Sequence, residues 1–110
     1  GEDYEGAIAP LLEGAELLYG DTGLKAGYLL GLAYEKSQKF DDALETYLRL
    51  GVLYPRTMPF VMEGKMNAAL LLERLGRLGD AVDLYGELLR EGTDEVKARV
   101  EERLQLLENR

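Results

Sequence analysis

Apolar residues recur at intervals of three, four and seven positions along most of this chain, a spacing that places side chains on one face of an α-helix. Short polar or glycine-containing breaks at 37–39 and 76–77 interrupt the pattern, and Pro55 and Pro59 flank the longest break. The sequence shows no sustained two-residue alternation of the kind that predicts a strand. The pattern therefore predicts an all-α fold. We expect six helices, over residues 3–18, 23–37, 40–53, 59–75, 78–91 and 94–108.

Two features refine this reading. Pro10 lies inside the first expected helix, where proline removes a hydrogen bond at a cost of about 3 kcal/mol, so we expect a kink or a break there. Thr93 and the two acidic residues after it suit the start of the last helix. That helix has a single apolar stripe, and we expect it to cover the preceding helices as a cap. The short connections predict antiparallel neighbours.

The chain also repeats itself. The matching segments are 4–12, 40–48 and 78–86. Their alignment superposes Ala7, Ala43 and Ala81, at spacings of 36 and 38 residues. Each alanine follows an aromatic residue or Leu by three places and precedes a large apolar residue by four. These offsets lie on one helical stripe, so the repeat predicts a recurring helix pair whose apolar face is covered by its neighbours.

The stretch from Leu29 to Pro55 resembles a tetratricopeptide repeat (TPR), a helix–turn–helix unit with a known signature. The residues that match at the family's spacings are Leu30, Gly31, Tyr34, Ala43, Tyr47 and Pro55. Gly27 occupies the signature's Trp position, which is a departure. A weaker second copy keeps Ala68, Ala69, Leu72, Ala81 and Tyr85, with Thr93 in place of the closing proline.

The resemblance implies a right-handed α-solenoid of antiparallel helix pairs that forms a single TPR-like domain over 1–110. Its parts would be a partial repeat at 3–19, repeats at 23–55 and 59–92, and a capping helix at 94–108. The long connection at 56–59 and the closing segment 91–107 are similar to those of bacterial envelope-assembly TPR proteins, including the Tol-Pal-associated and outer-membrane assembly lipoprotein types.

In this family, the first helix of each unit lines a concave groove that holds a peptide of a partner. Carried over residue by residue, the resemblance implies partner-binding positions at Lys25, Tyr28, Leu32, Glu35 and Lys36, and at Glu63, Met66, Asn67, Leu70, Glu73 and Arg74. An apolar floor with a rim of mixed charge suits an amphipathic helix or apolar peptide anchors. The alternative is that Leu32 and Leu70 belong to the core and that the charged residues are solvated. Only Asn67 matches the Lys and Asn clamp of chaperone-binding members.

Composition excludes several kinds of chemistry. The chain has no His and no Cys, which rules out imidazole and thiolate ligands, disulfides and a His-activated nucleophile. A net charge of -8 disfavours nucleic acid and anionic membrane surfaces, and no apolar run is long enough for membrane insertion. The scattered glycines form no phosphate-binding loop. We therefore expect no enzymatic activity, no metal and no cofactor. The lack of Cys is compatible with a cytoplasmic or a bacterial periplasmic location.

Two classes of function stay open at this stage. The first is a protein–protein interaction module that binds a partner's peptide or helical segment and acts as an assembly scaffold. The second is a homo-oligomerisation or structural module, for example in a bacterial envelope complex, with a homodimer covering the N-terminal helix. Residues 1–24 carry six acidic residues and no basic one. That stretch is either a solvated helix face or a docking surface for a basic partner.

Overall fold

The computed structural model describes residues 4–8 and 21–109. Residues 4–8 are helical. The longer helices are α2 (Asp21–Lys36), α3 (Phe40–Leu53), α4 (Pro59–Arg74), α5 (Leu78–Glu91) and α6 (Asp94–Glu108). The described part of the chain holds no strand, so the prediction of an all-α fold is confirmed there. Within the same part, no helix combines the length and apolarity that a membrane span requires.

The predicted bounds of α3, α5 and α6 agree with the structure. Helix α2 begins two residues earlier than expected and ends one residue earlier, and α4 also ends one residue earlier. Most of the first expected helix, with the kink expected at Pro10, lies outside the described residues.

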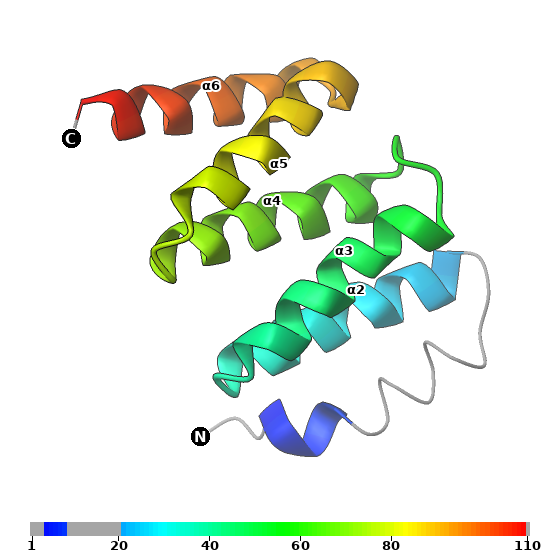
Figure 1. Ribbon diagram of the computed structural model, residues 1–110. Helices are drawn as coiled ribbons and strands as arrows, with labels where there is room; N and C mark the ends of the chain where they lie inside the picture. The colour runs from blue at the N-terminus through cyan, green and yellow to red at the C-terminus, as the bar shows by residue number, and fades with distance from the viewer. Residues whose placement is uncertain (1–3, 9–20, 110) are drawn as a thin grey trace.

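The helices follow one another through the molecule in chain order, from α2 to α6 (Figure 1). Helix α2 packs on α3, and α4 packs on α5, so each pair forms one antiparallel hairpin. Between the hairpins, α4 contacts both α3 and α2, while α6 contacts α5. The first helices of the two hairpins are therefore neighbours, which leaves α2, α4 and the cap α6 along one face.

The turns inside the two hairpins have the same geometry. Gln38 and Gly76, which are 38 positions apart, both adopt a left-handed backbone, with φ of 62° and 80°. In each turn the next backbone N–H donates to a carbonyl oxygen five residues back, from Lys39 to Tyr34 and from Arg77 to Leu72, both at 2.8 Å. Glycine favours this conformation and Gln does not. The two hairpins therefore share one turn geometry at positions that the repeat in the sequence aligns.

Small residues bring the helices of a hairpin close together. Ala43 and Ala81 are fully buried at equivalent positions, and Tyr47 and Tyr85 fill the space four residues further on. Gly31 on α2 faces the ring of Tyr47 so closely that an added Cβ would lie 2.5 Å from Cδ1 of that ring. The helices can cross at this distance only because position 31 has no side chain.

Helix α6 closes the end of the stack. The hydroxyl oxygen of Thr93 accepts a hydrogen bond from the backbone N–H of Val96 at 3.3 Å, which satisfies one free donor of the helix start. Val96 and Val100 are buried against the preceding helices. The apolar stripe read from the sequence is thus the face that α6 turns toward the rest of the protein.

Candidate partner-binding site

A tyrosine, a glutamate and an arginine form the same network in both hairpins. In the first, the hydroxyl of Tyr47 donates to Oε1 of Glu35 at 2.9 Å, and Nη1 of Arg74 donates to Oε2 at 3.2 Å. In the second, the hydroxyl of Tyr85 donates to Glu73. Arg103 binds the same carboxylate through Nε and Nη2 at 2.7 to 3.0 Å. Each network ties both helices of a hairpin to the next helix in the stack.

The two networks differ in how closed they are. The side chain of Glu73 is only 2% exposed and Arg103 holds it with a two-pronged contact, whereas Glu35 is 18% exposed. The side chain of Arg74 is 61% exposed and donates a single hydrogen bond to Glu35. Burial and the hydrogen bond to Glu73 raise the pKa of Tyr85, and the hydrogen bond to Glu73 raises the pKa of Arg103. Tyr85 therefore stays a neutral donor and Arg103 a cation at physiological pH.

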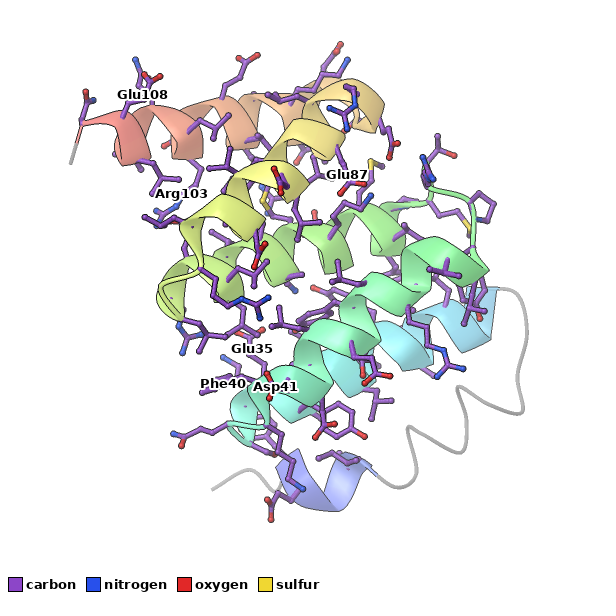
Figure 2. The ribbon with its side chains drawn as sticks, viewed as in Figure 1. Glu35, Phe40, Asp41, Glu87, Arg103 and Glu108 are labelled. Carbon is purple, nitrogen blue, oxygen red and sulfur yellow. The ribbon has the colours of Figure 1, made fainter. Side chains whose placement is uncertain are left out.

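A hollow of about 320 Å³ opens beside these networks, between α2, α4 and α6. Its lining residues are Glu35, Asn67, Leu70, Leu71, Arg74 and Arg103. Arg103 on α6 and Glu35 on α2 lie on the same side of the molecule, on either side of the C-terminal end of α4 (Figure 2). The hollow thus combines apolar Leu side chains with amide and guanidinium donors, a combination suited to polypeptide binding.

Further contacts hold the neighbouring side chains in place. The amide of Asn67 donates to the hydroxyl oxygen of Tyr28 at 3.1 Å, which connects α4 to α2. The ring of Tyr28 lies 5.2 Å from that of Phe60, centroid to centroid. Glu63 pairs with Arg99 of α6 at 2.6 Å. These contacts fix the first helices of the hairpins relative to one another and to the cap.

Four of the residues that the resemblance implies for partner binding come together in the hollow. They are Glu35, Asn67, Leu70 and Arg74. Lys25 and Lys36 are exposed on α2 and do not line it. Tyr28 and Leu32 are half-buried, pack against the core and do not line the hollow. Glu63 faces α6 through its pair with Arg99.

The placement of Met66 and Glu73 corrects the sequence prediction. The prediction put both on the open face, but the side chain of Met66 is buried in the main core and that of Glu73 is buried in its network. The reason is that α4 is enclosed by α2, α3, α5 and the arginines of α6, so less of its surface stays open than a lone helix would show. These two side chains are therefore buried and do not line the hollow.

Sequence reasoning missed Arg103 and Leu71 as lining residues. Arg103 was overlooked because α6 was expected to act only as a cap. A signal was nevertheless present, since Glu35 and Glu73 each precede a core tyrosine by twelve residues. A carboxylate at the interface between two helices is costly to bury without a cation beside it. In both hairpins the next helix along the stack supplies that cation as an arginine.

The comparisons with known proteins agree with this architecture. The family model described as tetratricopeptide repeat matches residues 25–57, which span most of α2 and all of α3. No curated protein and no solved structure matches the chain significantly. Within residues 4–8 and 21–109, no group of three or more acidic, His or Cys side chains is arranged to hold a metal ion.

Proposed function

Because the chain contains a tetratricopeptide repeat at residues 25–57 and has the all-α fold of such helical repeats, we propose that it binds a peptide or helical segment of a partner protein in the hollow between α2, α4 and α6. Tetratricopeptide repeats are typically non-enzymatic modules for protein–protein interaction. In this proposal the chain acts as an assembly scaffold and carries out no chemical step.

The composition of the hollow is the observation that supports the proposal. Leu70 is only partly buried there, beside Asn67 and the exposed guanidinium of Arg74. A peptide could place an apolar side chain on Leu70 and satisfy its own polar groups with the amide and the guanidinium. The hollow is short, so a weak or transient complex is expected.

Replacing Leu70 by Lys should reduce the affinity for a bound peptide at least about tenfold, because it removes the apolar contact and fills the hollow with a charged chain. Peptides would be selected from a random displayed library against the wild-type chain, and their dissociation constants measured by calorimetry. The matched control is Val82→Lys on α5, where the valine is 46% exposed and does not line the hollow. Equal affinities for the two variants would contradict the proposed site.

A second candidate function is self-assembly, supported by apolar side chains that are exposed on α2 and α3. These are Leu29, Leu48, Val52 and Leu53, of which Val52 is 83% exposed. Of the N-terminal apolar positions that suggested a homodimer, only Ile8 lies within the described residues, and it is half-buried.

The interaction-module proposal predicts that light scattering gives the mass of a single chain, 12.3 kDa, across a dilution series. A stable mass of two chains that Val52→Asp reduces to one would favour self-assembly instead.

A further inference from the structure

The hydrogen bonds around the hollow leave guanidinium donors unused. Arg74 gives one N–H to Glu35 and keeps four others, including an edge with two parallel donors. Arg103 gives Nε and Nη2 to Glu73, and its Nη1 makes no hydrogen bond within the described part of the chain. Each arginine therefore retains a pair of N–H groups that can bind a carboxylate with two hydrogen bonds.

The carboxylates of the same site are already occupied. Glu35 accepts from Tyr47 with one oxygen and from Arg74 with the other. Glu73 accepts from Arg103 with both oxygens and from Tyr85 as well, and its side chain is 2% exposed. Both carboxylates of the site already accept hydrogen bonds, so a basic side chain of a partner gains little from them. An acidic side chain can instead accept hydrogen bonds from the N–H groups that the two guanidinium groups leave unused.

The contacts of Arg74 prepare it for this role. Its guanidinium lies over the ring of Phe40 at 5.8 Å from the centroid and is held from the side by Glu35. The side chain is nevertheless 61% exposed, so its free donors can be reached. Arg103 is 35% exposed and is fixed by Glu73. Both guanidinium groups are thus oriented before a partner arrives, which lowers the entropic cost of binding.

The charge balance of α2 and α4 also suits an acidic group. These two helices supply five of the six lining residues, and each carries two acidic and two basic residues. Helix α3 carries three acidic residues and one basic one, α5 carries four and one, and α6, which adds Arg103 to the lining, carries five and three. An acidic group therefore meets less repulsion from α2 and α4 than it would along α3 or α5.

We propose that the hollow takes the carboxylate of an Asp or Glu side chain of the partner, held between Arg74 and Arg103, while an apolar residue beside it rests on Leu70. This inference rests on the proposed function, because it specifies which peptide chemistry the same hollow selects. Charge-assisted hydrogen bonds of this kind change affinity roughly tenfold to a hundredfold, and they weaken as salt is added.

The test uses a peptide selected from the random library against the wild-type chain, synthesised with its acidic residue and again with the matching amide. We expect selected peptides to be enriched in Asp or Glu next to an apolar residue. Arg74→Gln should weaken binding of the acidic peptide about tenfold or more and leave the amide peptide nearly unchanged. Arg49→Gln on α3, also exposed, is the matched control and should change neither affinity.

Arg103 is tested with a more conservative substitution, because its positive charge also neutralises the carboxylate of Glu73. Arg103→Lys keeps a positive charge beside Glu73 but removes the planar fork, so it should lower affinity for the acidic peptide with little change in melting temperature. An acidic and an amide peptide that respond equally to Arg74→Gln would overturn the inference, as would selection without acidic enrichment. In either case continued sensitivity to Leu70→Lys would leave the proposed function standing. Failure to select any peptide that depends on Leu70 would overturn both.

Discussion

Arg103→Ala should lower the free energy of unfolding by about 3 kcal/mol, because it removes the arginine that holds the buried carboxylate of Glu73 through both Nε and Nη2. The side chain of Glu73 is 2% exposed, so water replaces little of what the arginine supplies. The value is placed at the low end for a broken buried pair because Arg103 is itself 35% exposed and water screens part of the interaction. Urea denaturation of both proteins measures the difference.

The equivalent arginine of the first hairpin provides the control. Arg74→Ala removes the same residue type from the same kind of network, but Arg74 is 61% exposed and makes one hydrogen bond of 3.2 Å. Its loss should cost at most about 1 kcal/mol. Equal costs for the two variants would contradict the view that the second network is closed and the first is open.

Removing the acid as well should restore stability. In the double variant Arg103→Ala with Glu73→Gln, no unpaired charge stays buried, so the double variant should be more stable than Arg103→Ala alone. A double variant that is no more stable than Arg103→Ala alone would show that Arg103 stabilises the protein by packing and not by charge.

Local patterns in the sequence predicted the helices well. Helix α5 has charged and apolar residues on opposite sides and ends before Gly92, so its length follows from periodicity alone. The matched alanines Ala43 and Ala81 also marked the close contacts of both hairpins correctly, because a small residue at a helix crossing is visible in the sequence. Helix bounds and the small residues at helix crossings depend on neighbours along the chain, so the sequence alone could predict them.

The candidate site was predicted less completely. The residues that line it depend on how much of each helix surface the neighbouring helices bury. A stripe on α4 taken by itself includes Met66 and Glu73, but Met66 is buried in the main core and Glu73 is enclosed by Tyr85 and Arg103. Arg103 enters the site from 30 residues beyond Glu73, a separation that no local period reveals. Both differences come from tertiary packing around α4, so the helix register was right while the exposed part of its surface was not.

Gly31→Ala should destabilise the protein by about 2 kcal/mol, although the same change favours most helices. The new Cβ would lie 2.5 Å from Cδ1 of Tyr47, a ring that is 1% exposed and whose hydroxyl is held by Glu35. Overpacking of this kind costs about 1–3 kcal/mol, which outweighs the gain in helix propensity of up to about 1 kcal/mol. Thermal and urea melts of the variant measure the net effect.

Replacing Gly79 by Ala should change the stability of the protein in the opposite direction. Gly79 lies within α5, and an added Cβ there would have nothing within 4 Å, so only the gain in helix propensity remains. Gly79→Ala should therefore stabilise the chain by about 0.5 kcal/mol. If Gly31→Ala also proved neutral or stabilising, α2 and α3 could not cross as closely as the contact between Gly31 and Tyr47 requires, and the hydrogen bond from Tyr47 to Glu35 beside the hollow would have to be built differently.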